Sequence, residues 1–328
     1  MCSLAPPAPK YLDDVTRRRF MATGLVASAA LVVGCGSTER PRSTGSETHE
    51  VTDFLGPTTI PARPQRVVAD SVSIYAHLMS LGVTPVGAAM PVGISTSYFA
   101  PADDPITNVV ADDGWTVDLE EALTLRPDLI LAVGADYNED NCKRYRAAMA
   151  TYCFEEGWVD AADVAEKLLI PGRAIGRELE ARKAIDAYDT RVAAAKGRLA
   201  GRTESFSPAG TVRFDAAGFI GVRTNDIVQG VFGSLGLSEP KWPEVGASGY
   251  VELSMETLEI LNRAKTLFVT TDDDVDIDKM DVFKSGLWQG LKPVASGNAH
   301  FVGAWNGGDL LQLGRMVEDI EQALVGKP

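Results

Sequence analysis

Short apolar runs alternate with longer helical patterns along most of this chain, which is typical of parallel sheets covered by helices. Residues 66–69, 85–88 and 128–133 are predicted strands, and residues 74–81 and 119–125 are predicted helices between them. The run 128–133 is apolar throughout, as expected for a parallel strand that is buried on both faces. The pattern therefore predicts an α/β fold.

One long helical pattern, from residue 173 to residue 200, divides this alternation into two halves. Beyond it, further predicted strands lie at 211–214, 219–222, 266–270 and 299–302, and predicted helices at 226–235, 254–262 and 310–324. The chain is therefore predicted to consist of an N-terminal lobe (51–172), an interlobe helix (173–200) and a C-terminal lobe (201–328).

The N-terminus has the layout of an export signal. Residues 16–21, Thr-Arg-Arg-Arg-Phe-Met, lead into fourteen uncharged residues from Met21 to Gly34, fewer than the roughly 20 that a helix needs to cross a bilayer. A basic region, a short apolar region and a small-residue cleavage point describe a secretory signal. The paired arginines resemble the twin-arginine signal, and residues 32–35, Val-Val-Gly-Cys, resemble a bacterial lipobox. Residues 1–34 are therefore predicted to be a twin-arginine lipoprotein signal peptide.

Lipidation of Cys35 would hold the exported protein on the outer face of the cell membrane. Residues 36–50 are rich in Gly, Ser, Thr, Pro and charge without apolar periodicity, so residues 35–50 are predicted to form a flexible tether. Without the signal, 294 residues remain, with 27 basic and 43 acidic side chains. Such a surface repels nucleic acid. The membrane is therefore expected as a partner through the lipid alone.

Two cysteines remain after the signal and the lipid are accounted for, Cys142 and Cys153. Residues 138–149 are predicted to be a helix that runs back along the sheet, and residues 151–154 the strand that returns. From Cys142, about seven helical residues carry the chain ~10 Å along the sheet, and three strand residues up to Cys153 carry it back by about the same distance. The two sulfur atoms can therefore meet. In an oxidising compartment the pair is predicted to form a disulfide; the alternative is two inert buried thiols.

The motifs of the common enzyme classes are missing from the sequence. There is no Gly-x-Ser-x-Gly, no His-Glu-x-x-His, no phosphate loop, and no Gly-x-Gly-x-x-Gly after a strand, so no enzymatic activity is predicted. Beyond the signal the chain has three scattered histidines, His49, His77 and His300, which argue against a dedicated metal site. The acidic run at 272–278 lacks the glycine and the final glutamate of an EF-hand.

A set of motifs, in order and spacing, resembles the class III periplasmic-binding-protein family. The motifs are Pro64-x-Arg66-Val67-Val68, Leu81-Gly82-Val83-x-Pro85-Val86-Gly87, Leu119-Glu120, Leu125-x-Pro127-Asp128-Leu129-Ile130, Ser254-x-Glu256-x-Leu258 and Trp288-x-x-Leu291-x-Pro293-Val294-x-x-Gly297. The resemblance covers roughly residues 51–325. It departs at residues 149–154, where siderophore-binding members carry an Ile-Ala-Pro-Thr-like stretch, and this departure concerns the hinge side of the cleft.

This resemblance implies a fold and a function. Members of the family are the solute receptors of ABC importers for ferric siderophores, haem and cobalamin. They have two Rossmann-like lobes with parallel sheets, joined by one long rigid helix, and hold the ligand in a cleft between the lobes. The expected protein is a monomer without a cofactor that delivers an iron(III)-siderophore complex to a permease. The alternatives are a haem or cobalamin receptor, and beyond the family a tethered hydrolase.

The resemblance also implies roles for Glu120 and Glu256, which match the lobe-tip acids that dock permease arginines. Each also lies near the start of a predicted helix, where a carboxylate is stabilised by the helix dipole. The two interpretations are compatible.

Ligands of open parallel sheets lie beyond the carboxyl ends of the strands, and aromatic and arginine side chains there suit a ligand rich in oxygen atoms. The resemblance implies one further role, because Tyr98 lies where haem-binding members of the family carry a tyrosine and would be the axial ligand in a haem receptor. The predicted ligand-binding residues are Ser71, Tyr98, Trp115 and Tyr137 in the N-terminal lobe and Arg223, Trp242, Tyr250, Asp272 and Trp305 in the C-terminal lobe.

Overall fold

The computed structural model describes residues 47–91, 96, 99, 106–155, 164, 167–215, 217–223, 226–243, 250–271, 275–305 and 308–326. All of them belong to one compact unit, Gly45–Pro328. The predictions for the signal peptide and for Cys35, Tyr98 and Asp272 concern residues outside this described part of the chain.

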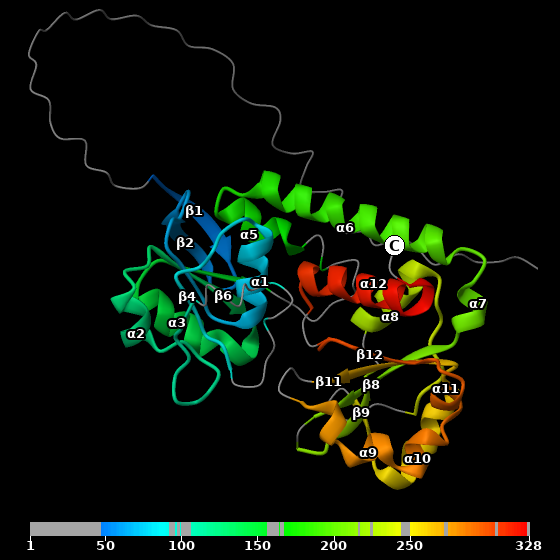
Figure 1. The fold of residues 1–328 in the computed structure, drawn as a ribbon. Helices are drawn as coiled ribbons and strands as arrows, with labels where there is room; N and C mark the ends of the chain where they lie inside the picture. The colour runs from blue at the N-terminus through cyan, green and yellow to red at the C-terminus, as the bar shows by residue number, and fades with distance from the viewer. Residues whose placement is uncertain are drawn as a thin grey trace, which may run out of the picture. The chain divides into compact units, whose positions relative to one another are not determined.

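The N-terminal lobe is built on a five-stranded parallel sheet with the strand order β5-β4-β3-β6-β7 (Figure 1). Its strands are β3 (Val67–Ala69), β4 (Gly87–Ala88), β5 (Thr107–Asn108), β6 (Leu129–Gly134) and β7 (Thr151–Glu155). Its helices are α1 (Val72–Ser80), α2 (Leu119–Thr124), η1 (Asp136–Asn138), α3 (Glu139–Ala148) and α5 (Leu169–Ala174). The predicted strands and helices of this half are confirmed to within a few residues.

The apolar run at β6 is continuous because helices cover both faces of the sheet. Leu129 and Leu131 point into one core, which includes residues of α1 and α5. Ile130 and Ala132 point into a second core, which includes residues of α2 and α3. All six residues of β6 are buried, as expected of a parallel strand between two layers of helices.

An antiparallel hairpin precedes the sheet. It is formed by β1 (Thr48–Asp53) and β2 (Gly56–Pro61), so regular structure begins at Thr48, inside the segment predicted to be a flexible tether. The side chain of Asp53 fixes the hairpin to the lobe, because it accepts hydrogen bonds from the backbone N–H of Cys153 at 2.8 Å and from Arg146. The body of the protein therefore starts a few residues earlier than the sequence pattern indicates.

The interlobe helix is α6 (Glu178–Leu199), and it is shorter than the predicted span of residues 173–200. The predicted span includes the end of α5, and the two helices are separated by a turn at Gly176. Gly176 has a φ of +70°, and a Cβ atom there would lie 2.8 Å from the carbonyl oxygen of Ala62. Only glycine fits this turn without strain.

Both lobes pack against α6. Ala181 and Ile185, in its first half, contact the core of the N-terminal lobe, and Ala195 and Leu199, in its second half, contact a core of the C-terminal lobe. Tyr188 packs against both cores. The predicted arrangement of two α/β lobes joined by one long helix is therefore confirmed (Figure 1).

The C-terminal lobe contains a second five-stranded sheet, with the order β10-β9-β8-β11-β12. Its strands are β8 (Ala209–Phe214), β9 (Ile220–Arg223), β10 (Tyr250–Leu253), β11 (Thr266–Thr271) and β12 (Ala299–Val302). Its helices are α7 (Thr203–Phe206), α8 (Asp226–Leu235), η2 (Met255–Arg263), η3 (Ile277–Lys279), α9 (Asp281–Lys284), α10 (Gly286–Gln289), α11 (Lys292–Ala295) and α12 (Leu310–Val325).

The direction of β9 corrects the prediction of a parallel sheet in this lobe. Strands β8, β11 and β12 are parallel, whereas β9 runs antiparallel to both β8 and β10. The carboxyl end of β9 therefore points away from the edge at which β8, β11 and β12 end.

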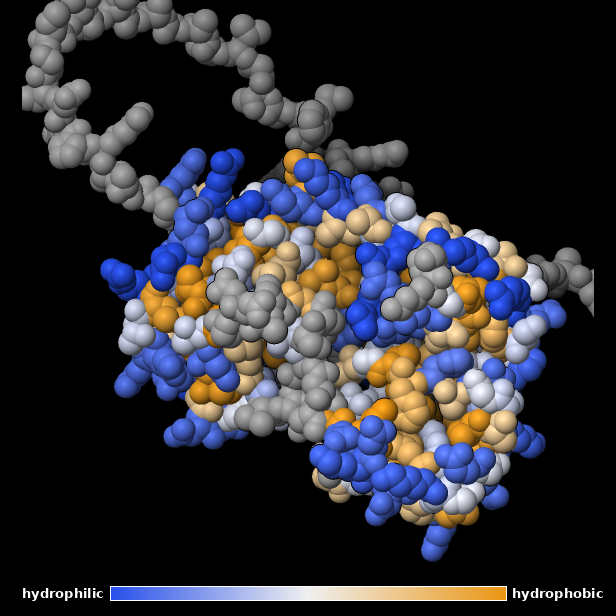
Figure 2. All heavy atoms as spheres, in the orientation of Figure 1, coloured by the Kyte–Doolittle hydropathy of each residue, from blue (hydrophilic) through white to orange (hydrophobic). Residues whose placement is uncertain are grey.

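Among the described residues, no helix is both long enough and apolar enough to cross a bilayer. The face of the molecule drawn in Figure 2 carries hydrophilic and hydrophobic residues side by side.

Candidate functional site

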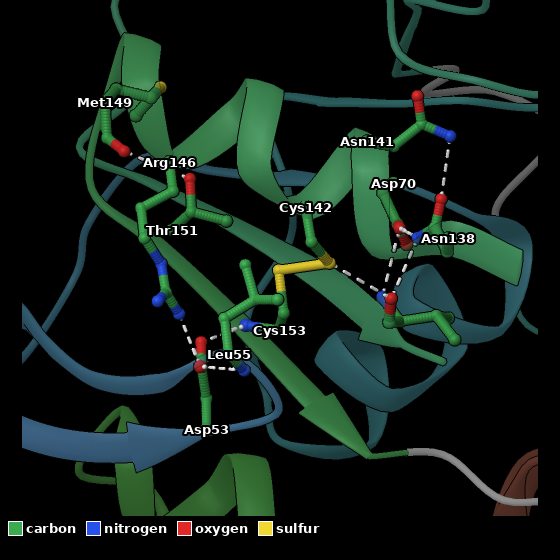
Figure 3. The surroundings of a disulfide bond; sticks show 11 residues. Asp53, Leu55, Asp70, Asn138, Asn141, Cys142, Arg146, Met149, Thr151 and Cys153 are labelled. Atoms are coloured by element: carbon green, nitrogen blue, oxygen red, sulfur yellow. Dashed lines mark hydrogen bonds and ion pairs between the residues drawn. A yellow bond between two sulfur atoms is a disulfide. The ribbon is translucent and has the colours of Figure 1, made fainter. Parts of the chain in front are cut away.

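The carboxyl edge of the N-terminal sheet is organised around Asp70, which follows β3. Its Oδ2 atom accepts hydrogen bonds from the backbone N–H of Val133 and from the side-chain amide of Asn138, each at 3.0 Å. The same amide donates to the carbonyl oxygen of Val133 at 2.8 Å (Figure 3). This buried carboxylate ties the ends of β3 and β6 together and fixes the start of α3.

Ser71 and Tyr137 lie beside this network. Ser71 is the N-cap of α1, where its hydroxyl accepts a hydrogen bond from the N–H of Ile74 at 3.3 Å. Tyr137, on η1 directly before Asn138, has 73% of its surface exposed. The structure therefore brings these two predicted residues to one edge, Ser71 in a capping role and Tyr137 open to solvent.

Trp115 lies in a separate turn. Asp113 holds this turn by accepting hydrogen bonds from the N–H groups of Trp115 and Thr116 at 2.8 and 2.9 Å, and hydrogen bonds to the Thr116 and Trp115 backbone lower the pKa of this carboxyl. The Trp115 ring is 68% exposed. Since Val117 N–H donates to the Tyr145 hydroxyl on α3, the turn is fixed to the flank of the lobe.

The C-terminal lobe gathers two arginines. Arg213, near the carboxyl end of β8, is aligned with Thr270 of β11. Arg223 lies on the same face of the sheet, and its Nη1 donates a hydrogen bond to the carbonyl oxygen of Trp305, which follows β12. Although β9 runs in the opposite direction, the Arg223 guanidinium thus reaches the edge at which the parallel strands end.

Aromatic rings accompany this pair. The Arg213 guanidinium lies 5.8 Å from the centre of the Phe219 ring, a distance at which cation–π attraction operates. Phe219 meets Tyr250 edge to face, with ring centres 5.4 Å apart, and Tyr250 is paired with Arg223 in the β9–β10 register. We call Arg213, Phe219, Arg223 and Tyr250 the arginine cluster; all four residues are half-buried.

In the arginine cluster, the positive charges of Arg213 and Arg223 lie close together and are partly shielded from water. Burial lowers the pKa of Arg223, Tyr250 raises it, and the positive charge of Arg213 lowers it again. The two positive charges repel each other, so each raises the free energy of the other. An anion placed between them would remove this repulsion.

Arg213 and Phe219 are not among the residues predicted from the sequence. A signal for Arg213 is present, since it is the one charged residue in the otherwise uncharged β8 sequence Ala-Gly-Thr-Val-Arg-Phe. A charge in such a strand is costly to bury unless it is paired and hydrogen-bonded, so this arginine stands out in the sequence.

Two predicted tryptophans pack against the C-terminal sheet, Trp305 buried and Trp242 half-buried. The Trp305 side chain is 2% exposed, within the core formed with α8 and α12. Trp242 packs on the opposite face of the sheet, in the core that includes Val212, where its ring covers Gly210 at the start of β8. Of the C-terminal candidates that the structure describes, Arg223 and Tyr250 face each other on β9 and β10, and the Arg223 guanidinium reaches the Trp305 carbonyl.

Glu120 and Glu256 lie at equivalent places in the two lobes. Each is an exposed residue in the first turn of a short helix, α2 or η2. Asp118 caps α2 by accepting from Glu120 N–H at 2.9 Å. Ser254 and Thr257 form a capping box at the start of η2. The caps fix the backbone at both acids and leave their carboxylates facing solvent.

The structure contains a disulfide between Cys142 and Cys153, the pair predicted from the sequence. It joins α3 to β7, with the two Cα atoms 6.2 Å apart, and both residues are fully buried. Figure 3 shows the bond between the Asp53 contacts on one side and the Asp70–Asn138 network on the other. One covalent link thus lies next to the anchor of the hairpin and to the carboxyl edge of the sheet.

Known proteins resemble the chain over most of its length. Residues 67–301 match the family described as periplasmic binding protein. YhfQ of Bacillus subtilis, named as an ABC transporter substrate-binding lipoprotein, is 24% identical over 84% of this chain and 87% of its own. The iron(3+)-hydroxamate-binding protein FhuD of the same organism is 27% identical over 86% of this chain and 88% of its own.

Solved structures share the fold. The siderophore periplasmic binding protein from the fuscachelin gene cluster of Thermobifida fusca superimposes with a TM-score of 0.66 at 22% identity. The superposition covers 82% of this chain and 99% of that protein.

Proposed function

The chain belongs to the periplasmic-binding-protein family of solute-binding proteins, which are not enzymes, and on this premise we propose that it captures a ferric siderophore between its two lobes and delivers it to an ABC importer. The observation that carries the proposal is the arginine cluster on the C-terminal sheet, in which the Arg223 guanidinium reaches the Trp305 carbonyl beyond the end of β12. The similarity to FhuD, whose name states that it binds iron(3+) hydroxamate, supports the same class of ligand.

The chemistry of ferric chelates suits this cluster. Hydroxamate, catecholate and carboxylate groups surround the iron with oxygen atoms that carry negative charge. A guanidinium group binds such oxygens through two parallel hydrogen bonds, while Phe219 and Tyr250 offer ring surface to the organic part of the chelate. The chelator supplies every ligand of the iron, so the protein needs no metal site of its own; the described residues contain no cluster of metal-binding side chains.

The proposal is tested by titrating the tryptophan fluorescence of the tether-free protein. Ferric desferrioxamine B, ferric citrate and a ferric catecholate are the probes, and each metal-free chelator is the matched control. We expect saturable quenching by at least one ferric complex and weaker quenching by its metal-free form. Saturable binding of cobalamin alone, or a Soret band from haem in the purified protein, would point to the alternative ligands. No quenching by any of these compounds would contradict the receptor function.

Glu120 and Glu256 are proposed to dock the permease. Both are exposed acids in the first turn of a capped helix, one on each lobe, so they present two negative charges to a partner that carries arginines. We expect Glu120→Lys or Glu256→Lys to lower ligand-dependent ATPase stimulation of the importer in proteoliposomes at least tenfold, because reversal of a docking charge adds repulsion to the lost attraction.

Ligand affinity should be unchanged in both variants. Glu50→Lys, an equal charge reversal at an exposed site on the hairpin, is the matched control and should keep normal stimulation. If Glu120→Lys and Glu256→Lys weaken ligand binding instead, the two acids act in the receptor itself and not at the permease.

Cys35 is proposed to carry the lipid that tethers the protein to the outer face of the membrane after export by the twin-arginine pathway. The lipobox-like Val-Val-Gly-Cys and the similarity to YhfQ, a named lipoprotein, support this. The stretch from Cys35 to the first strand at Thr48 spans at most about 45 Å when fully extended, which keeps the receptor close to its importer and raises its effective concentration there.

We expect Cys35→Ser to move the protein from the membrane fraction to the soluble fraction and to abolish incorporation of radiolabelled palmitate. Fractionation and fluorography of cells that express each form make the measurement. Cys2→Ser, in the predicted signal peptide, is the control and should label normally. Palmitate incorporation that persists in Cys35→Ser would rule out Cys35 as the attachment site.

A further inference from the structure

The carbonyl oxygen that accepts from Arg223 belongs to a residue whose side chain is itself held in place. The indole N–H of Trp305 donates a hydrogen bond to Oδ2 of Asp319 at 3.0 Å. Trp305 is 2% exposed and Asp319 8% exposed. A hydrogen bond to a carboxylate that is shielded from water is stronger than one between neutral groups, so this contact fixes the indole.

Packing fixes Trp305 from the other side. Its ring lies against Phe268 of β11, with ring centres 5.4 Å apart, and it belongs to the core formed by α6, α8 and α12. Since the side chain is held at its edge by Asp319 and at its face by Phe268, the backbone of Trp305 has little freedom. Its carbonyl oxygen is therefore a fixed acceptor at the carboxyl edge of the sheet.

The charge of Asp319 is balanced within its own helix. Arg315, one turn earlier on α12, donates from Nε to Oδ1 of Asp319 at 2.9 Å. The two carboxylate oxygens thus have separate partners, Arg315 for Oδ1 and Trp305 for Oδ2. This separation makes it possible to remove either contact while the other is kept.

Helix α12 is joined to the interlobe helix by two further ion pairs. Arg191 pairs with Glu318 and Arg198 pairs with Glu321. Asp319 lies between these two glutamates in the sequence, on the inner side of α12. These two ion pairs therefore fix the position of Asp319 relative to α6.

We propose that Asp319 and Trp305 are positioning residues that hold the guanidinium of Arg223 in place for an anionic ligand. The proposal rests on the proposed function, in which Arg223 binds a ferric chelate. Neither residue contacts the ligand. Asp319 fixes the indole of Trp305, and the Trp305 carbonyl orients Nη1 of Arg223. The arginine then presents its remaining donors to the ligand without a loss of side-chain freedom on binding.

The test is a double-mutant cycle on Arg223 and Asp319. Affinity for ferric desferrioxamine B and ferric citrate is measured in Asp319→Ala, Arg223→Met and the double variant. We expect Asp319→Ala to weaken binding about tenfold, and the double variant to bind no more weakly than Arg223→Met, since interacting residues do not add. Additive losses would overturn the proposal.

Two variants separate positioning from general stability. Asp319→Asn keeps an oxygen that accepts from the indole, so we expect it to bind within about threefold of the wild type. Arg315→Gln removes the other partner of Asp319 and leaves the Trp305 contact, so it should also bind normally. Trp305→Phe, which keeps most of the ring but not the N–H, should reproduce the loss seen in Asp319→Ala; normal binding by Trp305→Phe would contradict the mechanism.

A measurement without ligand keeps this inference independent of the ligand's identity. Hydrogen exchange of the Arg223 guanidinium, followed by nitrogen-15 NMR in the free protein, should be about tenfold faster in Asp319→Ala than in the wild type or Arg315→Gln, as expected when an anchoring hydrogen bond is lost. Equal exchange rates would overturn the positioning role even if no chelate binds. Faster exchange without any chelate binding would support the positioning role and contradict the proposed function.

Discussion

Replacement of Arg223 by methionine is expected to weaken the binding of a ferric chelate about 100-fold, or about 2.7 kcal/mol, the value of one strong charge-assisted interaction. Methionine keeps the unbranched aliphatic stem of the side chain and removes the guanidinium, so packing around β9 should survive. The lost guanidinium also removes the repulsion on Arg213, which favours the folded state and offsets the hydrogen bond lost at Trp305. Titration of tryptophan fluorescence makes the measurement.

Arg263→Met is the control for this prediction. Arg263 is an exposed arginine of the same lobe whose Nη1 donates to the carbonyl oxygen of Lys241. The two variants lose the same charge, so an effect of net charge alone would weaken both equally. Arg223→Lys should bind with intermediate affinity, because lysine keeps the charge but not the paired donors. Wild-type affinity in Arg223→Met would exclude the arginine cluster as the ligand site.

The sequence predicts the buried strands well. β6 and β11 lie between two layers of helices, and every residue of the first and five of the six residues of the second are buried. A strand in that position must be apolar on both faces, so its composition carries the information locally. The two lobes are predicted from the same alternation of strands and helices, and the joining helix is predicted from the long helical pattern that interrupts it.

Strand direction cannot be predicted in this way. The side chains of a short strand alternate in the same manner whether it runs parallel or antiparallel, so the pattern of residues 220–223 does not give the direction of β9. Its true direction depends on the short turn between β8 and β9, in which Asp215 accepts from the N–H of Phe219. Arg223 lies level with Thr211, in the first half of β8, and its long side chain reaches the carbonyl oxygen of Trp305, which follows β12.

A second limit of prediction from sequence concerns the hairpin and the loop tryptophans, whose positions depend on partners far away in the sequence. β1 has a half-polar sequence, Thr-His-Glu-Val-Thr-Asp, and it is ordered by Asp53, whose partners Arg146 and Cys153 lie about a hundred residues away in the sequence. Trp305 is drawn inward by Asp319, and Trp242 by the space over Gly210. Such partners are determined by the tertiary structure, so a loop aromatic alone does not indicate a ligand contact.

Removal of the disulfide by Cys142→Ala with Cys153→Ala is expected to lower the free energy of unfolding by about 3 kcal/mol, the loop-closure entropy for cysteines about a dozen residues apart. The sequence separation is 11. Alanine suits these sites because both are fully buried and apolar. The free energy of unfolding is measured by urea denaturation of the tether-free protein.

The controls use the wild-type protein itself. Thiol titration of the denatured, unreduced protein should find neither Cys142 nor Cys153 free, and prior reduction should lower stability to that of the double variant. Two free thiols would contradict the bond. The loss should also appear locally, since the bond joins α3 to β7 beside the backbone N–H of Cys153, which donates to Asp53. Hydrogen exchange of that amide should therefore quicken in the double variant, while amides of β11 in the other lobe stay protected.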